Sequence, residues 1–361
     1  MITFKELMND PTMFKTFVRE LAPAFKQPRF GMYSEEAYSE TRDWKGVAAL
    51  NGRIPMASMV DPYSGKPVIG SEKPLDMEGE LPTFGNIVSF TSKEYARIGA
   101  IERAIADGVT NPEELIKYLN NYFERLAVGP LISIDKLFFE TFSNGTSTIL
   151  AADNLSNLSM SIDWGIPKKF VGTVWSDAAN AKGLDDLETL YNYMKDTNGV
   201  ILDKFTMNRN TFSLLQAQTS TKSAIGSYFA EGGTTTKYTG TPSLDAVNKV
   251  LISGKMLPPI QIEEYQISYY NTDGITIKKT ESAFKDGRVS GTVGEIVGSF
   301  IWTPSDEQRM PDIEAVYQDV NHVMISKRTH KGKITFESEL NGIVVPTMME
   351  QMGILITDAT A

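Results

Sequence analysis

The sequence contains no cysteine and only two histidines in 361 residues. Without cysteine the chain can form neither disulfides nor thiolate sites for catalysis or metal binding. His322 precedes a β-type segment, and His330 lies before a Lys-Gly turn. Histidine is the usual side chain for proton transfer near neutral pH. Two histidines at the ends of a strand favour a structural role over a catalytic pair.

Motifs for bound cofactors are absent as well. The sequence has no nucleophile elbow, no phosphate-binding loop and no zinc-protease motif. Segment 287–298, "GRVSGTVGEIVG", carries four glycines without dinucleotide-binding spacing, and we interpret it as a flexible loop that enters a strand. "NTDG" at 271–274 forms a turn but lacks the other ligands of a calcium loop. We therefore predict no cofactor, no metal ion and no catalytic residue.

The charge balance is acidic, with a formal net charge of -10. This argues against a DNA-reading groove or a surface for anionic membranes. Asp185-Asp186 suits the first turn of a helix, and Glu263-Glu264 places one acid on each face of a strand. Neither pair marks a two-carboxylate site like that of a glycosidase. No apolar run approaches a membrane span, and the N-terminus lacks the apolar core of a signal peptide.

Two segments have strong helical patterns. Residues 3–22 repeat apolar side chains at helical spacing, and Pro11 divides them into two short pieces. Residues 111–144 form the strongest helix signal, with Thr110 or Asn111 as a cap and Glu113 in the first turn. Gly129-Pro130 should kink or break this helix. If its two pieces are nearly collinear, the element spans roughly 50 Å, at about 1.5 Å per residue.

Residues 52–92 form a turn-rich excursion that lacks the apolar residues to build its own core. Apolar runs near Ile54–Val60 and Asn86–Thr91 predict two strands, and "DPYSG" at 61–65 predicts an irregular tip. A two-stranded arm is marginally stable alone in water. We therefore expect another surface to cover it.

The middle of the chain has an α/β pattern, and β-type sequence returns after His322. The predicted helices cover residues 184–195, 210–218 and 243–251, and the predicted strands cover 205–208, 260–270 and 295–302. The closing strands are "HVMISKR", "KITFESEL" and "GIVVPTMMEQMGILIT". The sequence therefore predicts an α+β fold.

This order of elements resembles the major capsid proteins of tailed double-stranded DNA phages, with the Hong Kong 97-type fold. The resemblance is closer to the lambda-type branch, capsid protein E. It rests on the excursion, on "IDWGIP...VGTVWSDAANAKGLDDLETL", on "FTMNRNTFSLLQ", and on "ITFESELNGIVVPTMMEQMGILIT". It covers roughly residues 52–357.

The resemblance implies a division of the chain. Residues 1–51 would be an N-terminal arm and residues 52–100 the extended loop, or E-loop. The peripheral domain would comprise 101–165 and 322–361, with the spine helix at 111–144, and the axial domain would comprise 166–321. The implied assembly interface on the E-loop consists of Ile54, Met56, Met59, Asp61, Pro62, Tyr63, Pro82, Phe84, Ile87 and Phe90.

The implied function is that of a structural subunit, not an enzyme. Copies of the chain would form the hexamers and pentamers of an icosahedral shell, which encloses phage DNA without sequence-specific binding. Other virion proteins, such as portal, scaffold or decoration proteins, would be partners, with no membrane. The shell would assemble in the host cytoplasm and form the virion capsid. The short N-terminal segment is unlike a long scaffolding segment, so we expect a separate scaffolding protein or none.

Three alternatives remain open from the sequence. An encapsulin-like compartment would have the same fold but would enclose protein. A carboxylate-dependent hydrolase would use residues 52–92 as a lid. A phage tail or adhesin component would form tubes instead of closed shells.

Overall fold

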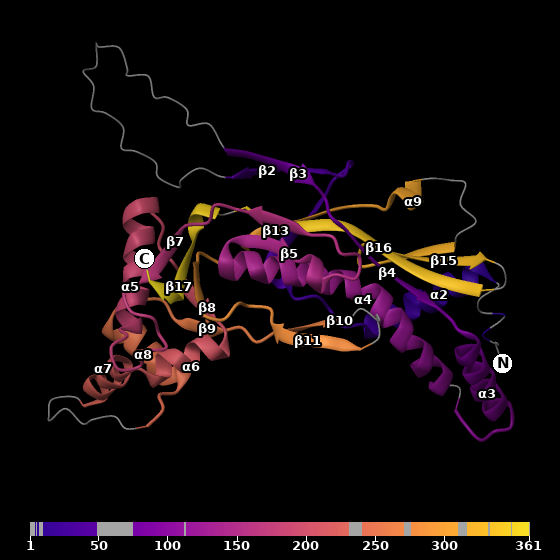
Figure 1. Ribbon diagram of the computed structural model, residues 1–361, viewed down its shortest axis with the longest axis horizontal. Helices are drawn as coiled ribbons and strands as arrows, with labels where there is room; N and C mark the ends of the chain where they lie inside the picture. Colours follow the sequence, from indigo (N-terminus) through magenta and orange to yellow (C-terminus); the bar gives the residue numbers. More distant parts are fainter. Residues whose placement is uncertain are drawn as a thin grey trace, which may run out of the picture.

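Two β-sheets and one long helix organise the chain (Figure 1). The structure, a computed structural model, describes residues 4, 6, 10–48, 75–111, 113–230, 240–270, 276–309, 316–330, 333–347 and 349–360. The helices are α2 (Pro11–Leu21), α3 (Ser92–Ala106), α4 (Glu113–Asn144), α5 (Gly183–Tyr193), α6 (Arg209–Ala217), α7 (Thr219–Phe229), α8 (Leu244–Lys249) and α9 (Asp306–Arg309). Among the described residues, no helix combines the length and the apolar character that a membrane crossing requires.

Strands occur in both halves of the chain. Together with the helices they confirm the predicted α+β class. The first half contains β1 (Ser34–Tyr38), β2 (Asp43–Ala48), β3 (Leu75–Glu80), β4 (Thr83–Ser89), β5 (Thr146–Ile149), β6 (Met160–Asp163) and β7 (Lys168–Val171). The second half contains β8 (Lys204–Met207), β9 (Ile260–Ile262), β10 (Gln266–Tyr270), β11 (Ile277–Ser282), β12 (Arg288–Thr292), β13 (Gly298–Thr303), β14 (Val316–Val320), β15 (Val323–His330), β16 (Lys333–Pro346) and β17 (Met352–Thr360).

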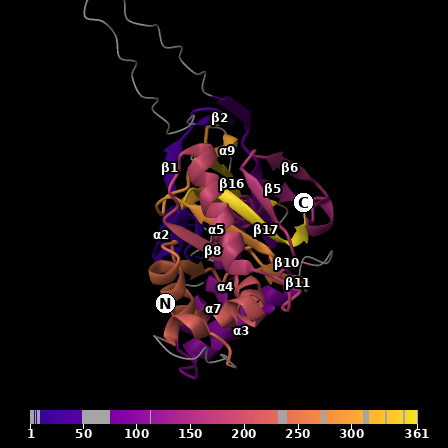
Figure 2. The ribbon, with the colours of Figure 1, turned by 90° about the vertical axis from the view of Figure 1, so that its left-hand side faces the viewer.

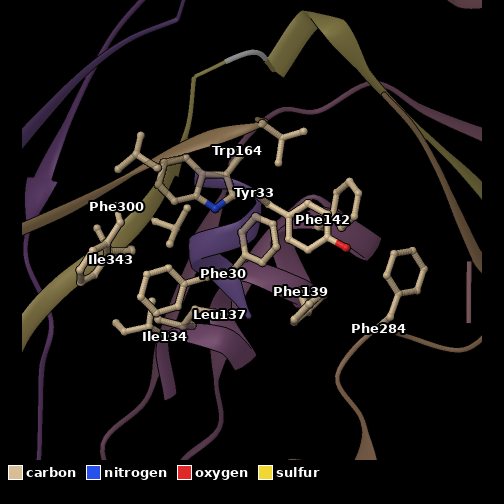
Figure 3. Packing of buried hydrophobic residues seen from close by; sticks show 14 of the residues in the cluster. Phe30, Tyr33, Ile134, Leu137, Phe139, Phe142, Trp164, Phe284, Phe300 and Ile343 are labelled. Atoms are coloured by element: carbon tan, nitrogen blue, oxygen red, sulfur yellow. The ribbon is translucent and has the colours of Figure 1, made fainter. Parts of the chain in front are cut away.

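A six-stranded sheet packs against α4. Its strand order is β1-β13-β16-β15-β14, and β4 pairs with the first half of β16. Two clusters of buried side chains lie between this sheet and the helix. In the first cluster, Phe30 contacts Phe300 with ring centroids 4.6 Å apart (Figure 3). Tyr33 stacks on Phe138, with ring centroids 5.5 Å apart. We call the sheet, α4 and these two cores the helix body.

A five-stranded sheet, ordered β7-β17-β12-β8-β9, forms the centre of a second body. Helices α5 to α8 lie beside it at one end of the molecule, and Figure 2 looks onto that end. Its core contains Trp175, Leu187, Phe205, Leu215 and Val289, all fully or almost fully buried. We call this the α/β body. Strand β17 follows β16 closely, so the chain returns to both sheets at its end.

The sequence predicted a kink or a break at Gly129-Pro130, and in the structure the long helix continues through this position. Helix α4 runs from Glu113 to Asn144 with Pro130 inside it, and the ribbon changes direction along its length (Figure 1). Proline removes one backbone hydrogen bond and crowds the preceding turn, which bends a helix. The packed side chains on both sides of Pro130 keep the two segments in one helix.

The interpretation of residues 287–298 as a flexible loop that enters a strand is wrong for residues 288–292, whereas residues 293–297 form the connection that enters β13. Residues 288–292 form β12, a central strand in which every residue is buried. A Cβ atom at Gly291 would lie 2.5 Å from Leu202 Cδ1, and the hydroxyl of Ser290 donates a hydrogen bond to the carbonyl of Phe142 in α4. The small residues therefore permit close packing on both faces of the sheet.

The expected strand at 260–270 is two strands. Strand β9 ends at Ile262 and belongs to the α/β body, whereas β10 begins at Gln266 and pairs with β11. Residues 263–265 connect them. The sequence carries a signal for this break, because the apolar positions change phase at Glu263-Glu264, from 260 and 262 to 265, 267 and 269.

Phe336 is the residue whose loss should damage the helix body most. It is fully buried in β16, and its ring lies 5.1 Å from Phe123, 5.5 Å from Phe90 and 5.8 Å from Phe14. Phe336→Ala should lower the free energy of unfolding by about 3–5 kcal/mol, because it leaves a cavity between four elements. Chemical denaturation measures the loss.

The control is Ile87→Ala on the neighbouring strand β4, where the side chain is 68% exposed. This variant should stay within about 0.5 kcal/mol of the wild type. Equal losses in the two variants would contradict the described core.

Candidate assembly surface

The two histidines occupy structural positions. His322 and Asn321 both have positive φ, 68° and 51°, and they form the two-residue turn between β14 and β15. The His322 ring lies 4.1 Å from that of Trp302, and its Nε2 atom lies 3.3 Å from a Glu36 oxygen. His330 ends β15. The described part of the chain holds no group of three or more side chains that could bind a metal ion.

The acid pairs singled out in the sequence serve separate partners. Glu263 is buried and accepts hydrogen bonds from the Tyr33 hydroxyl and from Arg29, whereas the exposed Glu264 pairs with Arg209. Asp185 and Asp186 lie in the first turn of α5, as predicted. Asp186 accepts a hydrogen bond from the indole of Trp175, and its burial raises its pKa.

A two-stranded ribbon is present next to residues 49–74, but its strands are not the two that the sequence predicted. Strands β2 and β3 pair in antiparallel register from Asp43–Glu80 to Ala48–Leu75. The predicted strand at 54–60 lies outside the described residues. The predicted strand at 86–91 corresponds to β4, which pairs with β16 in the helix body and not with the ribbon. The paired strands on either side of residues 49–74 are therefore β2 and β3, which lie beside the six-stranded sheet (Figure 1).

The start of β2 and the end of β3, which we call the root of the ribbon, pack against the core of the helix body. Trp44 of β2 is 3% exposed and packs on Trp164, with ring centroids 5.4 Å apart. Leu81, directly after β3, is equally buried, and its amide donates to the Arg42 carbonyl at 2.7 Å. The Arg42 guanidinium pairs with Asp306 at 3.2 Å. These contacts hold the start of β2 and the end of β3 against the rest of the described structure.

The structure places only four of the ten predicted interface residues. Pro82 accepts a hydrogen bond from the amide of Gly342, and Phe84 packs on the first core. Phe90 is 3% exposed inside the subunit, where it contacts Phe336. Ile87 is the one residue of these four whose side chain is exposed. The remaining six lie outside the described residues: Ile54, Met56, Met59, Asp61, Pro62 and Tyr63.

The sequence reasoning missed the residues that anchor the ribbon. Trp44 and Arg42 belong to the predicted N-terminal arm, because the first apolar run that predicts a strand of the excursion lies later, at 54–60. Alternation in "DWKGVA" is weak, and "LDMEGE" is largely acidic and has few strand-forming residues. A single signal was available, since a tryptophan in an otherwise polar segment is usually packed against a core.

Comparisons with known proteins find similarity in structure alone: no family model and no curated protein matches the chain. A prophage protein from E. coli CFT073, assigned as a capsid protein, is 11% identical, with a TM-score of 0.54 over 97% of this chain and 99% of that one. A phage-related protein from Bordetella bronchiseptica RB50 is 9% identical, with a TM-score of 0.46 over 94% and 95% of the two chains. The fold is therefore that of the prophage protein, and the resemblance stated from the sequence is confirmed at the level of the fold.

Gly79 provides a test of how the ribbon is anchored. A Cβ atom at this position of β3 would lie 2.9 Å from the indole ring of Trp44. Gly79→Ala should therefore displace the ring from Trp164 and lower the free energy of unfolding by about 1–3 kcal/mol. Thermal unfolding and the fluorescence of the tryptophans measure the effect.

Gly99→Ala is the matched control, since a Cβ atom there meets nothing within 4 Å in helix α3. It should raise the stability by about 0.5–1 kcal/mol, because alanine favours helix more than glycine does. A stabilising effect of Gly79→Ala would mean that Trp44 is not packed at the root of the ribbon.

Proposed function

We propose that this protein is a shell subunit, the major capsid protein of a tailed phage. The observation that carries the proposal is the fold, which this chain shares over nearly its whole length with the prophage protein from E. coli CFT073. The residues support a structural role, because the acids and histidines singled out in the sequence are engaged in packing, ion pairs and turns. A second candidate function has no specific observation in its favour.

In this proposal the helix body is the peripheral domain and the α/β body is the axial domain. The peripheral domain is then wider than residues 101–165 and 322–361, since β1, β4 and β13 share its sheet. The axial domain is correspondingly smaller than residues 166–321. Ribbon β2–β3 and residues 49–74 form the E-loop, and β4 belongs to the peripheral domain.

The E-loop contacts a neighbouring copy in the assembled shell. Its ribbon has two strands, and a pair of strands needs a further surface for stability. Its apolar residues Ile54, Met56 and Met59 lie in the part of the chain between β2 and β3. Such a contact buries about 1,600 Å² in total if it has the size of a standard interface. Because Phe90 is buried within its own subunit, we exclude it from the proposed interface.

The partners follow from the shell. Copies of the chain bind one another in hexamers and pentamers, other virion proteins bind the shell, and double-stranded DNA fills it without sequence-specific contacts. The acidic net charge of -10 suits a wall along which DNA must move. The protein is located in the virion capsid, which assembles in the host cytoplasm.

Sedimentation and negative-stain microscopy of the purified full chain test the proposal. Closed particles containing hundreds of copies support it. Tubes favour a tail component, and particles no larger than small oligomers at all concentrations contradict it.

Replacing residues 49–74 with Asn-Gly tests the E-loop. Ala48 and Leu75 face each other across the ribbon, so a two-residue turn can close the hairpin at this pair. Both bodies should stay folded, because the buried clusters of the described residues are built from other segments of the chain. Shell assembly should fail. Circular dichroism measures the folding, and sedimentation measures the assembly.

The matched control keeps all 26 positions of 49–74 but replaces Ile54, Met56 and Met59 with serine. This variant retains the length of the loop and loses its apolar contacts, so assembly should be weakened by at least ten-fold in critical concentration, equivalent to about 1.4 kcal/mol per contact. Normal shells from both variants would mean that the loop is not an assembly element.

A further inference from the structure

A buried carboxylate in the middle of α4 has no role in the proposed shell contacts. Asp135 is fully buried, and one of its oxygens accepts hydrogen bonds from the backbone amides of Arg29 at 2.9 Å and Phe30 at 2.7 Å. The residues it holds are more than 100 positions away in the chain. A buried carboxylate is costly unless it is well bonded, so its position calls for an explanation.

The amides that bind Asp135 belong to residues 25–33, which connect the turn after α2 to β1. We call these residues the strap. The strap is buried at Phe25, Phe30 and Tyr33, and its residues 26–29 are exposed or half-buried. It is therefore anchored at its ends by packing and in the middle by polar contacts.

A second buried acid holds the other side of the strap. Glu263 is 3% exposed, and it accepts hydrogen bonds from the Tyr33 hydroxyl at 2.8 Å and from the Arg29 guanidinium at 3.1 Å. Glu263 directly follows β9 of the α/β body. Two residues later, Tyr265 packs in the first core of the helix body and hydrogen-bonds to Asp135.

These contacts join three elements at the junction of the two bodies: α4, the strap and the connection between β9 and β10. We propose that Asp135 and Glu263 lock the strap across this junction, and that ionisation of Asp135 loosens the lock. The lock lies within one subunit, so this inference goes beyond the proposed function and does not depend on it.

The charges around Asp135 come from every element packed on it. Lys26 and Arg29 of the strap lie over the Tyr265 ring, with centroid distances of 4.9 Å and 5.7 Å. From the connection between β9 and β10, Tyr265 hydrogen-bonds to Asp135, and Glu263 pairs with Arg29. Lys204 of β8 lies 5.6 Å from the centre of the Tyr33 ring. The charge of Lys26 lowers the pKa of Asp135 and so acts against the effect of burial.

Burial raises the pKa of Asp135 to about 6, although the amides of Phe30 and Arg29 act in the opposite direction. A carboxyl whose pKa is higher in the locked state binds its proton more tightly there than in the open state. The contribution to stability is therefore complete at low pH and is lost as the pH rises through about 6. Alkaline conditions loosen the strap and acidic conditions tighten it.

Hydrogen exchange of peptides that cover the strap tests the inference on the full-length protein. After correction for intrinsic exchange, the opening of the strap should increase about ten-fold between pH 5 and pH 8, given an ordinary aspartate pKa near 3.9 in the open state. Peptides from the central strand β12 should show no such increase. A strap whose opening does not change with pH contradicts the inference.

Three variants assign the effect to Asp135. Asp135→Asn keeps the shape and an oxygen for the two amides, so the strap should stay closed and lose its pH dependence. Asp135→Ala should open the strap at every pH, and trypsin should then cut after Arg29 at least ten-fold faster. Asp107→Asn changes an exposed acid at the end of α3 and should retain the wild-type pH profile. Persistence of the wild-type profile in Asp135→Asn would overturn the inference.

Discussion

The packing of helix α4 against the six-stranded sheet is the contact on which the rest of the structure depends. Phe123 and Leu126, before Pro130, belong to the core beneath β4 and α2, whereas Ile134 and Phe142, after it, belong to the core beneath β13. The carbonyl of Phe142 also accepts a hydrogen bond from Ser290 of the α/β body. One helix of about 48 Å, at 1.5 Å per residue, therefore sets the positions of both bodies and of the strap.

The placement of the ribbon follows from this arrangement. Trp164, which supports Trp44, lies in the same core as Ile134 and Phe142. The ribbon is thus anchored to the helix body through side chains that pack on α4.

The elements that the sequence predicted well are those with a local signal. The caps and apolar spacing of 111–144 located α4 to within two residues, and the β-type pattern located β15 and the first part of β16. The end of β16 was assigned to the closing strand instead. The elements that it missed depend on distant residues. Strand β12 has small residues at Ser290 and Gly291, where α4 and Leu202 approach it closely. Strand β4 looked like part of an arm because its partner β16 lies some 250 positions later. The role of Asp135 likewise depends on amides that no local pattern connects with it.

Cryo-electron microscopy of particles formed by the purified full-length chain is the most direct test of the shell proposal. We expect closed shells in which residues 49–74 of each copy lie on an adjacent copy. Strands β2 and β3 should keep their antiparallel register, from Asp43–Glu80 to Ala48–Leu75. Particles in which residues 49–74 fold back on their own subunit, or a chain that forms no closed particle, would contradict it.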